Sequence, residues 1–221
     1  MPFDDVAVDV ADHVRQETGL PVAGPTGSNA LLALDKQRQI EVARTAGLLV
    51  PVTTVLQPRQ PLPDLDEPGP WIAKSALAVT VSDGRVGKGA SSVAHNREAL
   101  ALLMVGRTDP VLVQPILLGT GAGVFGHARR GEVMNLSAHR RLRMMNPAGS
   151  GSSACRSVDV APQLEDAARR FIGHAGWDGL FMIELLTDGD GRHWFMELNG
   201  RAWGSMALAT RRGLDYPAWA V

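Results

Sequence analysis

The sequence predicts an α+β protein in which the sheets are mainly antiparallel. Segments with helical and with strand patterns are interleaved along the 221 residues, but they do not alternate in the strict strand-helix-strand order of a parallel sheet. Two pairs of strand-forming segments are joined by short turns, one at Arg130-Gly131 and one at the DGDG sequence of residues 188–191. Hairpins of this kind connect antiparallel neighbours, which supports the α+β class.

The first third of the chain is predicted to hold helices, strands and one irregular connector. A short helix and a strand end at Gly24-Pro25, and Ser28 caps a helix that stops at Gly47. A β-branched strand follows over residues 48–56. Residues 57–70 contain five prolines, so we expect a surface connector there.

The rest of the chain continues the mixture of helices and strands. Asn96 and Gly176 mark a helix start and a helix stop, because Asn caps N-termini and Gly ends helices. The expected elements are strand 71–79, a glycine-bearing segment 82–92, helix 97–106, strand 111–118, two short strands within 123–142, a basic, glycine-rich stretch 139–157, helix 162–176, strands 179–187 and 192–199, and a final helix from about 203 to 212.

Composition and charge exclude several classes of function. The chain has 22 basic and 23 acidic residues, which argues against a main partner that is a nucleic acid or an anionic membrane. No apolar run reaches the ~18 residues that a membrane span needs, and the N-terminus lacks a basic signal region, so we expect a cytoplasmic protein. Cys155 is the only cysteine, which excludes an internal disulfide and a multi-thiolate zinc site.

The strongest chemical signal is a pair of acids in the last predicted hairpin. If Asp190-Gly191 forms a two-residue loop, Glu184 lies directly opposite Glu197, and a four-residue DGDG loop shifts the pairing by two but keeps the same faces. Alternation puts Asn199 on the face of Glu197. The opposite face is expected to carry the apolar side chains Ile183, Leu185, Trp194, Met196 and Leu198.

This arrangement suggests a metal site. Two like charges that face each other across a hairpin destabilise it, so they favour a cation or a shared proton. Two carboxylates and an amide oxygen, without His or Cys, form an all-oxygen set suited to Mg²⁺ or Mn²⁺. The alternative is a solvated polar face with an Asn that caps the next helix.

Five segments of the sequence resemble a known family. They resemble, in family order, the ATP-grasp module of carboxylate-amine ligases related to the large subunit of carbamoyl phosphate synthetase and to biotin carboxylase. The resemblance runs from about Gly24 to Tyr216. Its segments are ALDKQRQIEVARTAGLLVPVTTVL, WIAKS, VLVQPILLG, HRRLRMMNPAGSGSSACRSV and FMELNGRAWGSMALATRRGLDYP.

The resemblance implies an ATP-grasp fold and a set of nucleotide contacts. Such a fold has two lobes with mainly antiparallel sheets and the nucleotide between them. Lys36 and Lys74, two of three lysines in the chain, match the family's nucleotide-binding lysines. A glycine-containing loop, Gly84 to Ser92, would close over the phosphates. Lys88 in this loop would be a weaker phosphate contact. Gln114 and Ile116 fall in the hinge strand that receives adenine.

The resemblance also implies a metal and a reaction. Glu184, Glu197 and Asn199 match the Mg²⁺ ligands, Mn²⁺ being the alternative ion, and Arg201 matches a phosphate contact. The implied enzyme is an ATP-dependent ligase that phosphorylates a carboxylate to an acyl phosphate, which an amine attacks to give an amide. Arg143 and Arg156, with the backbone N–H groups of residues 149–152, would hold the acyl phosphate or the acceptor, since Arg suits oxyanions. His139 is either a phosphate partner or a surface residue.

The domain organisation expected from the resemblance is that of an incomplete enzyme. Residues 1–25 are a remnant of an N-terminal pre-ATP-grasp domain, residues 26–49 the DK helix and linker, residues 50–112 the small lobe, and residues 113–221 a C-terminally truncated large lobe. The hinge lacks the acid that relatives carry after the glutamine, so the ribose contact is unassigned. The partners are a small carboxylate and an amine of unknown identity, and a homodimer is allowed.

Other readings of the motifs are weaker. An ATP-binding regulatory module without complete ligase activity is the alternative that the missing chain keeps open. Gly121-x-Gly123-x-x-Gly126 matches a dinucleotide fingerprint, but the residues after it read as strand and turn instead of helix. A P-loop fails because Ser82 replaces its first glycine and Gly89 its Ser or Thr. A nucleic-acid binder using HRRLR and Arg129-Arg130 lacks aromatic platforms.

Overall fold

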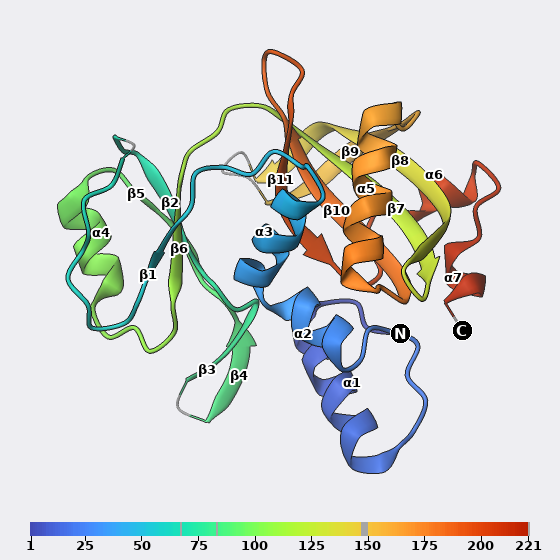
Figure 1. The fold of residues 1–221 in the computed structure, drawn as a ribbon, viewed down its shortest axis with the longest axis horizontal. Helices are drawn as coiled ribbons and strands as arrows, with labels where there is room; N and C mark the ends of the chain where they lie inside the picture. The colour runs from blue at the N-terminus through green and yellow to red at the C-terminus, as the bar shows by residue number, and fades with distance from the viewer. Residues whose placement is uncertain (67, 83, 147–149, 221) are drawn as a thin grey trace.

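The structure is a computed structural model that describes residues 1–66, 68–82, 84–146 and 150–220 (Figure 1). Its helices are α1 (Asp5–Thr18), α2 (Ser28–Leu34), α3 (Lys36–Thr45), α4 (Arg97–Met104), α5 (Pro162–Ala175), α6 (Met206–Thr210) and α7 (Tyr216–Trp219). Its strands are β1 (Thr54–Leu56), β2 (Trp71–Ser75), β3 (Val79–Ser82), β4 (Arg85–Lys88), β5 (Ser91–Ala94), β6 (Val111–Pro115), β7 (Thr120–Arg129), β8 (Glu132–Asn146), β9 (Ser150–Val158), β10 (Gly179–Thr187) and β11 (His193–Asn199).

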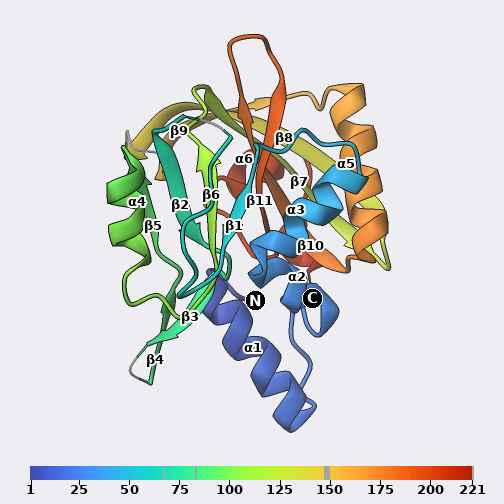
Figure 2. The same ribbon diagram turned by 60° about the vertical axis from the view of Figure 1, so that its left-hand side comes forward.

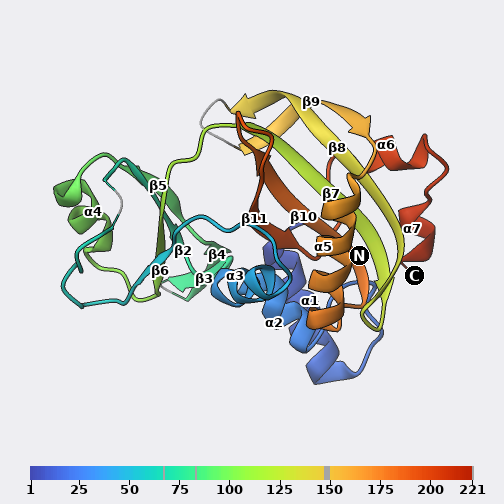
Figure 3. The same cartoon turned by 45° about the horizontal axis from the view of Figure 1, so that its top comes forward.

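The strands form two main sheets and a separate hairpin. The smaller sheet has the order β1-β6-β2-β5, the larger has the order β11-β10-β7-β8-β9, and β3 pairs with β4 alone. The strands that pair within these sheets do so antiparallel, which confirms the predicted fold class. The two sheets lie in separate lobes, and β11 is the edge of the larger sheet that lies toward the smaller lobe (Figures 1 and 3).

Each lobe has a core of its own. In the small lobe, Leu100 of α4 is fully buried against Trp71 and Ala73 of β2. In the large lobe, α3 and α5 cover one face of the sheet, where Phe171 and Phe195 stack with ring centroids 5.6 Å apart. On the other face, α6 and α7 close a third cluster, which consists of Phe125, Leu180, Met182, Trp203, Ala209 and Tyr216.

Several local predictions are confirmed. Asn96 caps α4 by accepting a hydrogen bond from the N–H of Ala99, and α5 ends at Gly176 with a φ of 55°, a left-handed conformation that favours glycine. The β7–β8 turn places Arg130 and Gly131 at φ values of 49° and 83°. Both residues are therefore in the left-handed region, as a tight hairpin turn requires.

The predicted helix from Ser28 to Gly47 is wrong in its continuity. It is broken at Asp35, whose extended backbone separates α2 from α3 and whose side chain accepts from the N–H groups of Gln37 and Arg38. Asp35 is therefore the N-cap of α3, while α2 begins after Gly27 without a side-chain cap. The break exists because residue 35 pairs with Leu77 near the small sheet.

Other boundaries also differ from the prediction. No strand forms before Gly24, and the strand expected over residues 48–56 is confined to β1. The glycine-bearing segment 82–92 is not a loop: it contains β4 and the start of β5. The basic stretch after residue 139 continues as β8 and β9, and the last predicted helix is reduced to α6. Gly151 and the serines of this stretch lie within β9.

The two lobes are joined by short backbone contacts as well as by the chain. The N–H of Lys36 donates to the carbonyl of Ala76 at 2.8 Å, and the N–H of Ala78 donates to the carbonyl of Leu34 at 2.8 Å. These bonds attach the start of α3 to the end of β2, next to the hairpin β3–β4 (Figure 2). The division into lobes at residue 112 stays a prediction, and β6 carries the smaller sheet on to Pro115.

Candidate functional site

The two acids of the last hairpin face each other as predicted. Glu184 in β10 is directly opposite Glu197 in β11, and Met182 is opposite Asn199. The loop itself is neither of the two that the sequence suggested, because five residues, 188–192, connect the strands. The carboxylate of Asp188 accepts from the N–H groups of Asp190 and Arg192, which widens the turn.

A β-bulge restores the predicted register. The pairing shifts between Glu184 and Leu185, so that Leu185 is opposite Phe195 and the extra residue is Met196. As a result Phe195, with an exposure of 1%, takes the core position that alternation assigned to Trp194 and Met196. The predicted apolar face is therefore correct for Ile183, Leu185 and Leu198 and wrong for those two residues.

Arg141, which the sequence analysis did not single out, is a direct partner of the acid pair. Its Nη2 donates to Oε1 of Glu184 at 2.6 Å, and both side chains are largely buried. The residue lies in β8, two strands from β10, and reaches across β7 at Gly121. A Cβ at Gly121 would lie 2.5 Å from Cδ of Arg141, so glycine provides the space for this side chain.

The lysines predicted from the resemblance act on the same acids. Lys36 begins α3 and Lys74 lies in β2, on the small lobe. Burial lowers the pKa of both lysines below the usual value, and the charge of Glu197 partly offsets this effect in each. The structure therefore brings two lysines from different segments to one carboxylate. Lys88, at the end of β4, borders the same cavity.

The two carboxylates differ in their electrostatic environment. Burial and the charge of Glu197 raise the pKa of Glu184, while Arg141 opposes the rise. Burial also acts to raise the pKa of Glu197, but the charges of Lys36 and Lys74 outweigh it, and the pKa lies below the usual value. Asn199 supports this ionised state, since its Nδ2 donates to Oε1 of Glu197 at 3.2 Å.

Arg201 follows Asn199 by two residues and is held by the N-terminal helix. Its Nε donates to Oδ1 of Asp5 at 2.8 Å, and its side chain keeps an exposure of 18%. The charge of Arg201 lowers the pKa of both Glu184 and Glu197, so the guanidinium lies near the acid pair. Asp5, like Arg141, was not found by sequence reasoning.

Glu184, Glu197, Asn199 and the cations Arg141, Arg201 and Lys88 border one cavity of about 620 Å³, whereas Lys36, Lys74 and Asp5 lie outside its lining. Its lining combines the acid pair with residues between 203 and 211, which follow β11, and with residues 152–155 of β9. The lining residues are Lys88, His139, Arg141, Ser152, Ser153, Ala154, Cys155, Met182, Glu184, Glu197, Asn199, Arg201, Trp203, Gly204, Ser205, Ala207, Leu208 and Arg211.

His139 is buried and is not a surface residue, which excludes one of the two readings from sequence. Its ring is 5% exposed, its Nδ1 lies 2.7 Å from Oγ of Ser205, and it packs on Phe125. Burial, together with the charge of Arg141, lowers the pKa of His139 to about 4, so the ring is neutral near pH 7. Its Nε2 has no hydrogen-bond partner among the described residues.

The remaining predicted residues lie outside this cavity lining. Arg143 and Arg156 are exposed, because a second irregularity in the β8–β9 pairing follows Arg141. Gly149, which the sequence analysis included among the backbone donors, lies outside the described residues. Gln114 is buried in β6 and donates to Oγ1 of Thr53, and the N–H of Ile116 donates to the carbonyl of Pro70.

The donor set fits a hard divalent cation. Glu184, Glu197 and Asn199 offer carboxylate and amide oxygens on one face of the β10–β11 pair, which suits Mg²⁺ or Mn²⁺. A cation would also relieve the repulsion between the acids that Arg141 now balances from one side. No group of three or more His, Cys, Asp and Glu side chains is found in the described part of the chain, so this two-acid set is the candidate.

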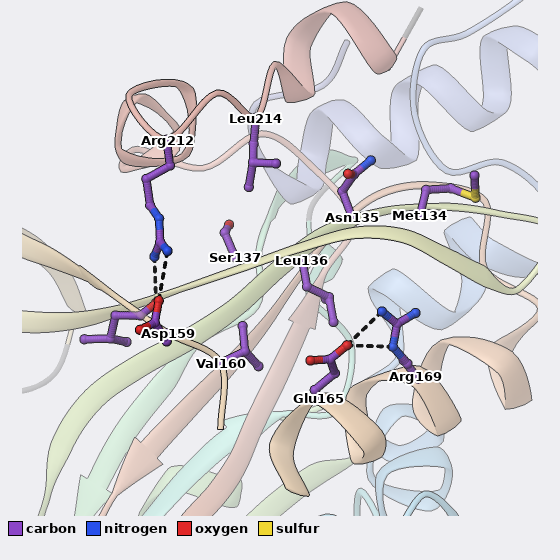
Figure 4. Close-up of a pocket in the computed structure, with 11 residues that line it drawn as sticks. Met134, Asn135, Leu136, Ser137, Asp159, Val160, Glu165, Arg169, Arg212 and Leu214 are labelled. Carbon is purple, nitrogen blue, oxygen red and sulfur yellow. Dashed lines mark hydrogen bonds and ion pairs between the residues drawn. The ribbon is translucent and has the colours of Figure 1, made fainter. Parts of the chain in front are cut away.

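A second cavity, of about 440 Å³, lies beside β8 and α5 (Figure 4). Its charged side chains are already paired with each other: Arg212 with Asp159 at 2.8 Å and Arg169 with Glu165 at 2.8 Å. It contains none of the residues predicted from sequence. The acid cavity is therefore the candidate functional site. Among the described helices, none has the length and apolar character that a membrane crossing requires.

Comparisons with known proteins support the fold. No family model and no curated protein matches the sequence. The L-amino acid ligase of Bacillus licheniformis has a TM-score of 0.68 at 16% identity, over 95% of this chain and 50% of that chain. The D-alanine–D-alanine ligase of Bacillus anthracis, complexed with ATP, has a TM-score of 0.65 at 15% identity, over 93% of this chain and 70% of that one.

A third similar structure is a carboxylase domain. The biotin carboxylase domain of the Hydrogenobacter thermophilus 2-oxoglutarate carboxylase, in complex with MgADP, ADP and bicarbonate, has a TM-score of 0.64 at 19% identity. The match covers 95% of this chain and 49% of that chain, so this chain spans about half the length of two of these three structures. The likeness extends over almost all of the chain and both of its lobes. This protein therefore has the ATP-grasp fold.

Proposed function

We propose that the protein is an ATP-dependent ligase that activates a carboxylate as an acyl phosphate and couples it to an amine. The observation that carries the proposal is that the charges of Lys36 and Lys74 act on Glu197, which lines a cavity together with Glu184 and Lys88. Cations and oxygen ligands on opposite sides of a cavity are what a metal-bound triphosphate needs. The likeness of the fold to ligases supports the same class.

The proposed reaction has two steps, and the acyl phosphate formed in the first step is consumed in the second. A carboxylate oxygen of the acceptor attacks the γ-phosphorus of ATP, and the bond to the ADP oxygen breaks. The amine nitrogen then attacks the acyl carbon, phosphate leaves, and the nitrogen loses a proton. Both steps move negative charge between oxygens, so fixed cations contribute more than covalent chemistry does.

Each charged residue has a proposed task in these steps. Lys74 and Lys36 neutralise the phosphate chain, and Lys88 is a weaker contact from the β3–β4 hairpin. Arg201 holds the transferred phosphoryl group. Glu184, Glu197 and Asn199 would hold Mg²⁺ or Mn²⁺, which would supply positive charge to neutralise the phosphates.

Arg141 joins the arginines proposed for the acyl phosphate. It borders the cavity and already binds a carboxylate, Glu184, so its guanidinium is suited to a second oxyanion there. Arg143 and Arg156 stay proposed acceptor contacts on the exposed part of β8 and β9. Gln114 and Ile116 stay the proposed adenine contacts, and since the N–H of Ile116 is bonded to Pro70, it is not free to donate.

The test begins with nucleotide binding. Thermal unfolding is measured with Mg-ATP, with ATP and a chelator, and with Mg²⁺ alone. At 100 times its dissociation constant, Mg-ATP is expected to stabilise the fold by about 2.7 kcal/mol. The chelated sample should lose most of this gain. An unchanged melting temperature at millimolar Mg-ATP would contradict the proposal.

The second stage selects the reaction. A panel of amino acids paired with amines is screened for ADP release, and mass spectrometry looks for the amide. The alternative function is an ATP-binding regulatory module without complete ligase activity. Tight Mg-ATP binding without ADP release by any pair would select the module.

The proposed assembly follows the lobes. Residues 50–112 form the small ATP-grasp lobe, residues 113–221 the large lobe, residues 26–49 the DK helix with its linker, and residues 1–25 belong to an N-terminal unit. A homodimer is the oligomer we propose for the protein, and sedimentation of the pure chain tests it. The carboxylate and amine partners are small molecules.

A further inference from the structure

We propose that Asp5 is a positioning residue of the ligase site: its carboxylate orients Arg201, so that the guanidinium meets the transferred phosphoryl group. The inference rests on the proposed function, and it adds a residue from the first helix, outside every segment that carries the family resemblance. The contact joins positions 196 residues apart in sequence. The bond is an ion pair of 2.8 Å between side chains that are 18% and 15% exposed.

The N-terminal segment is fixed at the residues that flank Arg201. The N–H of Ala202 donates to the carbonyl of Pro2 at 3.3 Å, and Pro2 is buried. Gly24 lies against the ring of Pro2 so closely that a Cβ there would be 2.7 Å from Cδ of the proline. The backbone that carries Asp5 is thus held directly beside the backbone that carries Arg201.

The start of α1 is also a suitable place for the side chain of Asp5. Asp4 caps the helix by accepting from the N–H of Ala7 at 2.7 Å, which makes Asp5 the first helical residue. A carboxylate at this position interacts favourably with the helix dipole. Farther along α1, Oδ1 of the buried Asp12 accepts from the N–H of Gly27 at 2.7 Å and fixes the helix to the start of α2.

The hydrogen bonds of Arg201 indicate that Asp5 orients the guanidinium and does not compete with phosphate for the same nitrogen atoms. Asp5 uses Nε, on the stem side of the guanidinium, and Nη1 makes a 3.4 Å bond to the carbonyl of Ala202. The described hydrogen bonds leave Nη2 unused, and Arg201 borders the acid cavity. A planar donor group held from its stem side keeps donors for an oxyanion on its outer edge.

The charges of the site make such a partner necessary. The cations that border the cavity or act on its acids are Lys36, Lys74, Lys88, Arg141, Arg201 and Arg211, and the carboxylates are Glu184, Glu197 and Asp5. Before nucleotide binds, like charges would drive Arg201 away from the lysines toward water. Asp5 acts on both Arg201 and Lys36, so it keeps cations in place that the phosphates later need.

The first experiment examines Arg201 without any nucleotide. The Nε–Hε signal of Arg201 is assigned in ¹⁵N-labelled protein by its loss in Arg201→Lys. In Asp5→Asn, we expect hydrogen exchange of this group to become on the order of tenfold faster, because its ion-paired acceptor is lost. Asp9→Asn is the matched control: Asp9 lies on the same helix and contacts His13 at 3.8 Å. An unchanged Arg201 signal in Asp5→Asn overturns the positioning role.

The second experiment measures what the positioning does. Calorimetry in the presence of Mg²⁺ measures the affinity for a non-hydrolysable ATP analogue and the affinity for ADP. Asp5→Asn should weaken the analogue about fivefold and ADP much less, and Asp5→Glu should restore part of the loss. Melting temperatures of all variants are recorded, so that a loss of fold is separated from a loss of affinity.

The outcomes distinguish this inference from the proposed function. If the parent binds neither nucleotide, the proposed function fails and the role of Asp5 fails with it. If the parent binds and Asp5→Asn binds equally well, only the role of Asp5 is wrong. Tighter binding by Asp5→Asn would also overturn it, because the carboxylate would then be a competitor of the phosphate.

Discussion

Glu184 and Glu197 show how neighbouring side chains give two identical residues different properties. Each is opposite the other, yet the pKa of Glu184 is raised by burial and by its partner, while lysines hold the pKa of Glu197 below its usual value. Glu197 therefore carries the fixed negative charge of the pair. Arg141 balances the charge of Glu184 through an ion pair of 2.6 Å. A divalent ion that binds between the acids would replace this balance.

We expect Glu197→Gln to abolish metal-dependent ATP binding while the fold persists. The variant keeps the shape of the side chain but loses the ionised ligand, so the affinity for Mg-ATP should fall on the order of 100-fold. Asn199→Ala should act in the same direction. Glu165→Gln is the matched control, since Glu165 lines the other cavity and pairs with Arg169. Parent-like Mg-ATP affinity in both site variants would refute the assignment of ligands.

His139 predicts a pH dependence of stability. Its pKa falls from 6.5 to about 4 on folding, so between these values the unfolded chain binds a proton that the folded chain does not. The folded state should therefore lose about 3 kcal/mol relative to the unfolded state as the pH falls through this window. Urea unfolding at pH 7 and pH 4 measures this for the parent and for His139→Asn. A difference of the same size in both proteins would show that another group is responsible.

At the scale of elements, the β10–β11 hairpin shows what could be predicted from sequence and what could not. Alternation and the DG dipeptide suffice to predict that Glu184 meets Glu197. The loop could not be predicted, because the Asp188 carboxylate accepts hydrogen bonds from backbone N–H groups and from the ring N–H of Trp194. These bonds lower the pKa of Asp188 to about 2. The bulge at Met196 then compensates for the wider loop. The right pairing therefore arises from a different loop than the one assumed.

The glycines of β7 have a structural task instead of the dinucleotide-binding one that their spacing suggests. Gly121, Gly123 and Gly126 lie in a strand, where each is approached by a neighbouring side chain. At Gly121 this neighbour is Arg141, and at Gly126 it is Phe181 of β10. The absence of Cβ atoms lets the central strands and the site arginine pack closely. The rejection of the dinucleotide motif is thus supported by the strand that these residues form.

Gly126→Ala is expected to destabilise the protein. A Cβ there would lie 2.4 Å from Cζ of Phe181 and 2.5 Å from the carbonyl oxygen of Asn135, and the backbone atom cannot move cheaply. The cost should be about 1–3 kcal/mol, the usual range for overpacked cores. Gly87→Ala in β4 is the control, because nothing lies within 4 Å of its Cβ position. Chemical denaturation measures both, and equal stability of the two variants would contradict this packing argument.

At the scale of the whole molecule, the site is assembled from segments that are distant in sequence. The acid pair, Lys36 and Lys74 could be proposed from local patterns and the family resemblance. Arg141 and Asp5 could not, because their contacts depend on strand order and on the return of the N-terminus to residue 202. The family resemblance points to Arg143, but the β8–β9 pairing is irregular around this residue, which is exposed, and Arg141 borders the cavity instead.

Lys74→Ala tests whether the nucleotide binds between the lobes. Lys74 lies in the small sheet, and its charge lowers the pKa of Glu197 in the large sheet. Its loss therefore removes a positive charge that acts across the two lobes. The affinity for Mg-ATP should fall at least about tenfold, whatever the acceptor. Arg85→Ala, an exposed cation on β4, should change it little. Retained affinity in Lys74→Ala would remove this residue from the site.

The paired backbone bonds between residues 34–36 and 76–78 restrict how the lobes can swing. They tie the first turn of α3 to the strand end just beyond Lys74. If the small sheet rotates, these bonds would place the pivot at residues 34–36 and 76–78, so Lys36 and Lys74 would move little. Lys88, at the far end of its hairpin, is carried through a longer arc. In substrate binding, the β3–β4 hairpin would then close over a phosphate chain that is already bound by Lys36 and Lys74.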